Sequence, residues 1–261
     1  MSFQHEERHE GVTHTLIILK KLAEVKLPTR WADFTLSAFE SADADRHPEG
    51  ERRQTVLALT LGNIYKVPPL VRIHSQCTTG EVFNSMRCDC YEQLHLALQA
   101  IAEQGAGVLI YEHEEGRGIG LMEKLRAYEL QDRGLDTVEA NLSLGHAVDL
   151  RTYALSVEVL RFLKIRSLRL MTNNPDKLHA VRSAGIEIVK RVSADIPLNP
   201  HSARYLATKR DKLGHLFSSA MDFLIPLPAN SRGTLFPQLC DVAAGAAPAT
   251  LHLVQAPDRK V

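Results

Sequence analysis

Short apolar segments alternate with helical ones along the middle of this 261-residue chain. The strand-like segments are rich in Val, Ile and Leu, and they span 55–61, 70–74, 108–111, 168–171 and 186–189. The segments between them carry apolar residues at helical spacing, and they span 92–103, 120–134, 152–163 and 175–184. This alternation predicts an α/β (α+β) fold, in which a mixed β-sheet is flanked by helices.

The two ends of the chain differ from this middle region. The first ten residues are polar, and residues 1–21 predict a leader that is helical or disordered. Residues 219–261 are rich in Pro and Ala and predict a loosely ordered tail. A polar stretch at 41–53 predicts an exposed loop between strands. The remaining segment, 22–218, is therefore expected to form the functional domain.

The composition is that of a globular protein. Its hydrophobic content of 44% is sufficient for a substantial core. The 31 basic residues balance 31 acidic ones, so no global field draws the chain to nucleic acid or to anionic lipid. We find neither the apolar region of a signal peptide nor an apolar stretch long enough to span a membrane. We therefore expect a cytoplasmic protein that binds neither nucleic acid nor membranes.

Three cysteines, Cys77, Cys88 and Cys90, lie close together in a polar stretch, whereas the fourth, Cys240, lies in the tail. A structural zinc site normally uses four protein ligands, and a catalytic one uses three and leaves a position for water. The triplet thus predicts one catalytic zinc ion per chain. Buried or redox-active thiols are the alternative, because free cysteines are often core residues. The preceding His74 fits either a further ligand or a hydrogen-bond donor to substrate.

Two loops have the composition of phosphate or purine sites. In the first, 115–120, glycines alternate between a strand and a helix, where backbone N–H groups can approach an anion. In the second, Asn174 is the expected N-cap and Pro175 the first helical residue, so Thr172 and Lys177 would hold a phosphate at a helix N-terminus. Either loop could instead have a purely structural role, the first as a tight connection and the second as an ordinary helix start.

Asp149 and Arg151 flank the start of the helix expected at 152–163. Such a pair is most often a surface ion pair. Tyr128 shares a helix face with Leu121 and Leu125, a pattern that usually indicates core packing. These residues alone do not identify a site.

Their neighbours make a recognisable series, which runs in this order: Arg72-Ile-His-Ser-Gln-Cys-Thr-Thr-Gly, Arg87-Cys-Asp-Cys90, Gln93-Leu94, Glu115-Gly-Arg-Gly-Ile-Gly-Leu121, Lys124-Leu-Arg-Ala-Tyr128, Asp136-Thr-Val-Glu-Ala-Asn141, Leu144-Gly145, Asp149-x-Arg151 and Thr172-Asn-Asn-Pro-x-Lys177. In order and spacing the series closely resembles the GTP cyclohydrolase II family, over about residues 22–217. The leader and the tail lie outside the resemblance.

The resemblance implies zinc-dependent hydrolysis of GTP. The imidazole ring is opened, and formate and pyrophosphate are released to give 2,5-diamino-6-ribosylamino-4-pyrimidinone 5'-phosphate, the first step of riboflavin biosynthesis. It also implies Mg²⁺ on the triphosphate and a homodimer. Asp149 would accept a proton, Arg151 would attack or stabilise the α-phosphate, and Tyr128 would assist ring opening. The expected nucleotide-binding residues are Arg72, Ile73, His74, Ser75, Gln76, Gln93, Glu115, Gly116, Arg117, Thr137, Thr172 and Lys177.

The chain departs from the family pattern near the cysteines. Gln76 replaces a usual glutamate, Tyr91 replaces a frequent glycine, and His113-Glu114 replaces a usual Arg-Gln. Two alternatives therefore stay open. One is a paralogue that stops at the formylated pyrimidine or serves another purine-derived pathway. The other is a catalytically silent zinc- and nucleotide-binding regulator.

Overall fold

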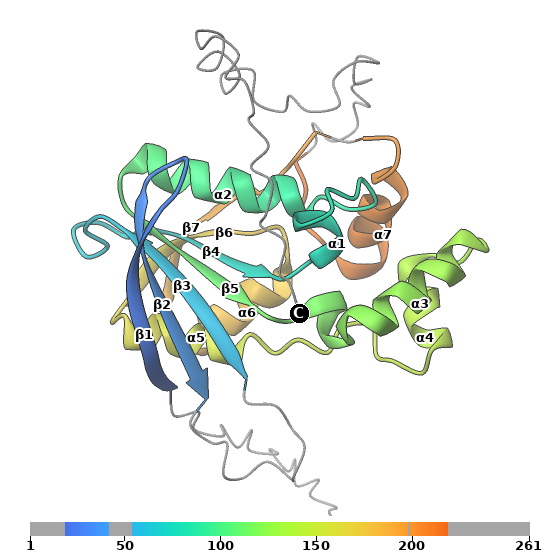
Figure 1. The fold of residues 1–261 in the computed structure, drawn as a ribbon, viewed down its shortest axis with the longest axis horizontal. Helices are drawn as coiled ribbons and strands as arrows, with labels where there is room; N and C mark the ends of the chain where they lie inside the picture. The colour runs from blue at the N-terminus through green and yellow to red at the C-terminus, as the bar shows by residue number, and fades with distance from the viewer. Residues whose placement is uncertain (1–18, 42–53, 198, 219–261) are drawn as a thin grey trace, which may run out of the picture. The chain divides into compact units, whose positions relative to one another are not determined.

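The computed structural model describes residues 19–41, 54–197 and 199–218. Within these ranges, seven strands form one sheet in the order β1-β2-β3-β5-β4-β6-β7 (Figure 1). The strands are β1 (Leu19–Pro28), β2 (Asp33–Ser41), β3 (Thr55–Leu61), β4 (Leu70–Ser75), β5 (Gly107–Glu112), β6 (Ser167–Met171) and β7 (Glu187–Val192). Strands β1, β2, β3 and β5 pair antiparallel in succession, whereas β5, β4, β6 and β7 pair parallel. The expected mixed sheet is thus confirmed.

Helices cover both faces of this sheet. Helix α2 (Cys90–Gln104) lies on one face, where Ala97, Leu98 and Ile101 pack against apolar strand residues. Helices α5 (Ala154–Phe162) and α6 (Pro175–Ser183) lie on the other face and contribute to a second buried cluster (Figure 1). Because strand side chains alternate between faces, Val108 and Ile110 join the second cluster and Leu109 joins the first.

The remaining helical segments surround the ends of the parallel strands. They are α1 (Thr78–Glu81), the 3-10 segment η2 (Glu115–Gly118), α3 (Gly120–Asp132), α4 (Thr137–Ser143) and α7 (Ala203–Leu213). The cysteine loop follows β4, η2 follows β5, and the Thr172–Lys177 segment follows β6. The carboxyl ends of parallel strands meet at one edge of a sheet, where open α/β sheets bind their ligands. The fold therefore brings all three candidate loops together.

The structure differs from the sequence prediction in the leader and at the start of α5, and it adds elements that the sequence did not suggest, among them β2, α4 and α7. The predicted leader, 1–21, lies outside the described residues except for Leu19–Lys21, which are the start of strand β1 and are not helical. Strand β1 is exposed on both faces, so it lacks the apolar alternation that reveals a half-buried strand. Asp149 and Arg151 lie in the loop before α5, because that helix begins only at Ala154. The predicted tail, 219–261, and most of the loop at 41–53 lie outside the described residues.

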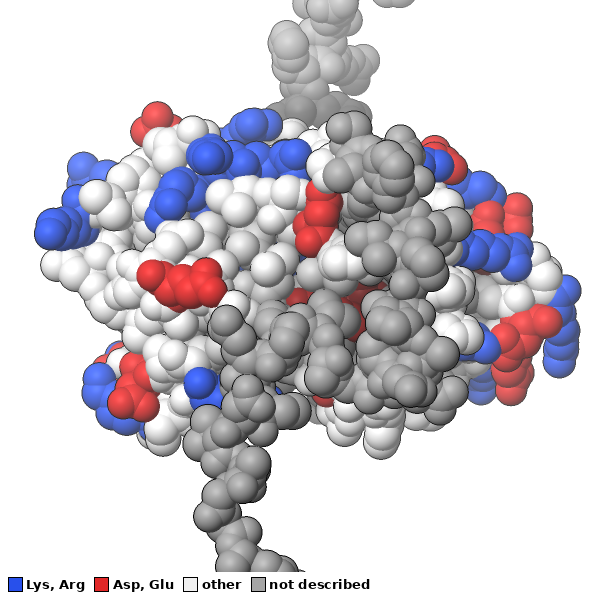
Figure 2. Space-filling model, turned by 90° about the horizontal axis from the view of Figure 1, so that it is seen from above, with Lys and Arg blue, Asp and Glu red and all other residues white. Residues whose placement is uncertain are grey.

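Basic and acidic side chains are interspersed on the face shown in Figure 2. This distribution agrees with the formal net charge of zero. No helix in the described part of the chain is both long enough and apolar enough to cross a bilayer.

Candidate active site

The three cysteines converge after strand β4. Their sulfur atoms all lie within 4.8 Å of one another, and the Sγ atoms of Cys77 and Cys88 are 3.6 Å apart. Gly80, in α1, makes this approach possible. A Cβ at Gly80 would lie 3.0 Å from Cys88 Sγ and 3.2 Å from Cys77 Sγ, closer than an ordinary contact.

The chemistry of these thiols fits a bound cation. In the absence of a metal, hydrogen bonds from Cys88 and Cys90 lower the pKa of Cys77, and the bond with Cys77 raises the pKa of Cys88 to about 12. Three thiolates within this distance need a cation to offset their repulsion, and zinc prefers such soft ligands. The residues present therefore fit a zinc ion held by three thiolates.

Glu81 holds the cysteine loop against the sheet. Its Oε1 accepts hydrogen bonds from the backbone N–H of Cys77 and from His74 Nε2, both at 2.9 Å, and its Oε2 accepts from the Tyr111 hydroxyl at 2.7 Å. Burial lowers the pKa of His74 to about 4, so the imidazole is neutral at pH 7. Because Nε2 donates to a carboxylate, we assign Nδ1 as an unprotonated acceptor.

Lys124 and Glu115 connect the metal loop to η2. Lys124 Nζ donates to Cys77 Sγ at 3.1 Å and to Glu115 Oε1 at 2.6 Å. The other carboxylate oxygen of Glu115 accepts from the backbone N–H of Thr78 at 2.7 Å. Gly116 permits this packing, because it has a positive φ of 63° and a Cβ there would lie 3.1 Å from Lys124 Cβ. Both oxygens of the buried Glu115 are thus already hydrogen-bonded to the protein.

Asp149 and Arg151 form a two-point ion pair in the loop before α5. Arg151 Nε and Nη2 donate to the two carboxylate oxygens at 2.9 and 2.5 Å, and Nη1 donates to Ser75 Oγ at 3.2 Å. Burial raises the pKa of Asp149, but the hydrogen bonds from Arg151 outweigh it and leave a net lowering. The pair is largely buried, with the Arg151 side chain 12% exposed, so it is not the surface ion pair that the sequence also allowed.

Arg72 and Lys177 place two further cations at the strand ends. Lys177 Nζ donates to the carbonyl of Ile73 at 2.9 Å, and Arg72 Nη1 donates to the carbonyl of Met171 at 3.1 Å. Burial, together with Arg72 and Arg151, lowers the pKa of Lys177. Asn174 caps α6 by accepting from the backbone N–H of Asp176 at 2.9 Å, which confirms the predicted helix start.

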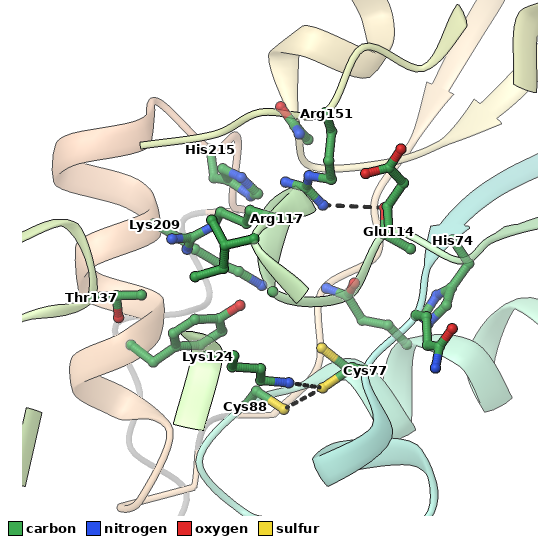
Figure 3. Close-up of a pocket in the computed structure, with 18 of the residues that line it drawn as sticks. His74, Cys77, Cys88, Glu114, Arg117, Lys124, Thr137, Arg151, Lys209 and His215 are labelled. Atoms are coloured by element: carbon green, nitrogen blue, oxygen red, sulfur yellow. Dashed lines mark hydrogen bonds between the residues drawn. The ribbon is translucent and has the colours of Figure 1, made fainter. Parts of the chain in front are cut away.

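These side chains surround one cavity. Figure 3 shows Cys77 and Cys88 on one side of it and Arg151 and His215 on the other. Most of the sequence-predicted residues line it: Arg72, His74, Ser75, Gln76, Cys77, Cys88, Cys90, Gln93, Gly116, Arg117, Tyr128, Thr137, Arg151, Thr172 and Lys177. Tyr128 therefore faces the cavity, and its hydroxyl lies 3.4 Å from Thr79 Oγ1.

Three predicted residues do not line the cavity. The side chain of Ile73 is buried in the core, Glu115 faces Lys124 and Thr78, and Asp149 lies behind Arg151. Sequence reasoning in turn missed several lining residues, of which the polar ones are Arg87, Glu114, Lys124, Gln131, Asn141, Asn173, Asn174, Tyr205, Lys209 and His215. Arg87, Lys124, Asn141, Asn173 and Asn174 lie within the series that resembles the family, and this signal could have identified them. Lys209 gave no such signal, because it lies on α7, a helix that the sequence did not suggest.

Unpaired polar atoms point to a missing ligand. Among the described residues, four buried side-chain N or O atoms have no hydrogen-bond partner, and three belong to cavity residues: Arg72 Nε, His74 Nδ1 and Arg117 Nη2. A buried polar atom without a partner costs about 1–3 kcal/mol, so such atoms mark places where a ligand bonds. The two arginine donors suit an anion, and the imidazole acceptor suits an N–H or O–H group.

Two of the departures noted in the sequence contact each other. The ring atom Nδ1 of His113 lies 2.9 Å from Gln76 Oε1, and Gln76 Nε2 donates to Thr78 Oγ1 at 3.2 Å. This hydrogen bond joins His113 to Gln76, which lines the cavity.

Comparison with known proteins agrees with this geometry. The family model of GTP cyclohydrolase II matches residues 20–193. This chain belongs to the GTP cyclohydrolase II family. The chain is 46% identical over 202 residues to a Neisseria meningitidis serogroup C protein named GTP cyclohydrolase-2, which covers 77% of this chain and 98% of that protein. It is 48% identical to a Klebsiella pneumoniae protein of the same name, over 77% of this chain and 97% of that one. The chain is accordingly an enzyme of this type.

Proposed function

We propose that this enzyme hydrolyses GTP at the imidazole ring, releases formate and pyrophosphate, and leaves the diaminopyrimidinone ribotide that begins riboflavin synthesis. One observation carries the proposal. A cluster of three thiols and a group of buried cations face the same cavity, so a metal-activated nucleophile and a polyphosphate site lie within reach of one ligand. The names of the related proteins support GTP as that ligand.

Zinc would be held by Cys77, Cys88 and Cys90. When bound, it supplies a water whose pKa falls from 15.7 to about 7, and hence a hydroxide for attack on the ring. His74 is placed to accept a hydrogen bond beside this site, because its Nδ1 is buried, unprotonated and without a partner among the described residues. The Tyr128 hydroxyl lies 3.4 Å from Thr79 Oγ1, which in turn lies 3.6 Å from Cys77 Sγ. Burial raises the pKa of Tyr128, so a protonated hydroxyl lies near the cysteines, where it would donate a proton to the ring nitrogen that leaves.

At the phosphate end, Arg151 would contact the α-phosphate. Because Asp149 pairs with its Nε and Nη2, the guanidinium is fixed in one plane and stays charged. This arrangement favours electrostatic stabilisation of the departing pyrophosphate over direct attack by a neutral guanidine. Arg72, Arg117 and Lys177 add positive charge along the triphosphate, and Mg²⁺ would neutralise the leaving group. We further propose that the enzyme is a cytoplasmic homodimer, for which light scattering after gel filtration is the test.

Recognition of guanine by Glu115 would be indirect. A direct bidentate pair with the base needs two free carboxylate oxygens, but Lys124 and the Thr78 N–H already occupy one each. Glu115 instead fixes the backbone of η2, where Gly116 and Arg117 face the cavity.

Incubation of zinc-loaded protein with GTP and Mg²⁺ tests the proposal. Formate and pyrophosphate should appear together, and the absorbance should shift from a purine to a pyrimidine spectrum. ATP, under the same conditions, should be turned over far more slowly, because unpaired buried groups penalise the wrong base. Pyrophosphate without formate, together with the loss of the purine spectrum, would indicate a paralogue that stops at the formylated pyrimidine. No product from zinc-loaded protein would leave a silent nucleotide-binding protein as the better description.

A further inference from the structure

Asp89 lies between two of the three cysteines, at the N-terminus of α2, and is 4% exposed. Its Oδ1 accepts a hydrogen bond from Lys209 Nζ at 2.8 Å, and its Oδ2 accepts one from Gln93 Nε2 at 2.7 Å. A buried carboxylate is costly unless it is paired and hydrogen-bonded. Asp89 and its two partners therefore hold one another in place.

The network continues from Gln93 to a second cation. Gln93 Oε1 accepts from Arg72 Nη2 at 2.7 Å, while Gln93 Nε2 also donates to the Ala194 carbonyl at 3.1 Å. The amide can serve Arg72 only through its oxygen and Asp89 only through its nitrogen, so its orientation is determined. Asp89 thus fixes Lys209 directly and Arg72 through Gln93.

Both cations line the cavity, together with the cysteines on either side of Asp89. Arg72 and Lys209 are 5% and 8% exposed, and Lys209 also lies over the Tyr205 ring at 4.4 Å. Lys209 comes from α7, which is distant in sequence from the cysteine loop. Figure 3 shows Lys209 on the side of the cavity that carries Arg117 and Thr137. One buried carboxylate therefore joins the metal-binding loop to two cations that face the ligand.

We propose that Asp89 is a positioning residue that couples metal binding to polyphosphate binding, an inference that rests on the function proposed above. A metal ion held by Cys88 and Cys90 fixes the backbone on both sides of Asp89. The carboxylate then holds Lys209 and, through Gln93, Arg72 in the geometry that a polyphosphate needs. Loss of the metal releases the loop, and the cations lose their common anchor. Coupling of this kind is reciprocal, so polyphosphate should also strengthen metal binding.

Calorimetric titration with inorganic pyrophosphate tests the coupling without catalysis. The full chain would be titrated zinc-loaded and metal-free, both as wild type and as Asp89→Asn. For each protein, the ratio of the pyrophosphate dissociation constants without and with zinc measures the effect of the metal. Because the charge of zinc attracts pyrophosphate in either protein, only the difference between the ratio of the wild type and that of Asp89→Asn reports on Asp89. We expect metal removal to weaken pyrophosphate binding at least tenfold in the wild type and less than threefold in Asp89→Asn. Equal ratios in the two proteins would overturn the proposal.

Two further variants keep the test independent of how well Asp89→Asn folds. Lys209→Met removes one arm of the network and should reduce the metal dependence while leaving zinc content unchanged. Asp211→Asn, on the same helix, changes an exposed carboxylate paired with Arg210 and should retain the wild-type ratio. If zinc-loaded wild type does not bind pyrophosphate, these cations are not a phosphate site and the proposal fails. That result is distinct from a negative GTP assay, which would refute the proposed reaction alone.

Discussion

Gly80→Ala should weaken zinc binding while leaving the metal-free fold intact. The added methyl group would lie 3.0 Å from Cys88 Sγ, 3.2 Å from Cys77 Sγ and 3.3 Å from Cys90 Cβ. Its backbone is not in the left-handed region, so alanine causes no strain of φ at this position. The effect of the substitution is therefore confined to the sulfur cluster.

The magnitude follows from two opposing terms. Overpacking of a tight site costs about 1–3 kcal/mol. In the metal-free protein the thiols can rotate away from the methyl group, and alanine stabilises the helical backbone by about 0.5–1 kcal/mol relative to glycine. In the zinc-bound protein the sulfurs are held in place, so the steric cost applies in full. We expect zinc affinity to fall roughly 10–100-fold, since each 1.4 kcal/mol is a factor of ten.

Competition with a chromophoric chelator measures the zinc affinity, and chemical denaturation of metal-free protein measures the fold. Thr78→Ala is the matched control, because it alters the same short helix without adding an atom near the sulfurs. Unchanged zinc affinity in Gly80→Ala would refute the argument that this glycine makes room for the cluster. A loss of metal-free stability would refute the claim that the strain arises only when the sulfurs are fixed.

Three further predictions concern the thiols, the phosphate end and His74. Cys88→Ser should lose most of its zinc by metal analysis, and it should convert GTP slowly to GMP without formate; full metal content with full activity would contradict the thiolate site. Arg151→Lys should retain zinc but lose nearly all turnover, because lysine lacks the planar fork that pairs with Asp149. If the variant released formate and pyrophosphate at the parental rates, Arg151 would be only a structural partner of Asp149. Burial lowers the pKa of His74 to about 4, so the unfolded state binds more protons than the folded state between about pH 4 and 6.5. The free energy of unfolding should therefore increase by roughly 3 kcal/mol as the pH rises across this range. Denaturation of metal-free protein across this range should show a flatter profile in His74→Gln, and an identical profile would contradict the neutral buried imidazole.

Local patterns made much of the fold predictable. The segment 55–61 is a strand with the predicted bounds, and α6 begins at Pro175 after the Asn174 cap. Such signals depend only on residues a few positions apart, such as the i to i+2 alternation of a strand or the side-chain cap of a helix. The grouping of Cys77 with Cys88 and Cys90 was equally visible, because the short loop between them keeps the thiols near one another.

Tertiary structure decided what no local pattern contains. Strand β1 is exposed on both faces and is held by pairing with β2, so its apolar pattern carried no signal. Glu115 was expected to bind the nucleotide, but it packs against Lys124 and Thr78 and is directed toward the metal loop. The sequence alone determined the central strand at 55–61, the start of α6 and the thiolate set, because these depend on neighbours along the chain. The sheet order and the placement of α7 brought Lys209 to Asp89, because contacts between distant segments depend on how whole elements pack.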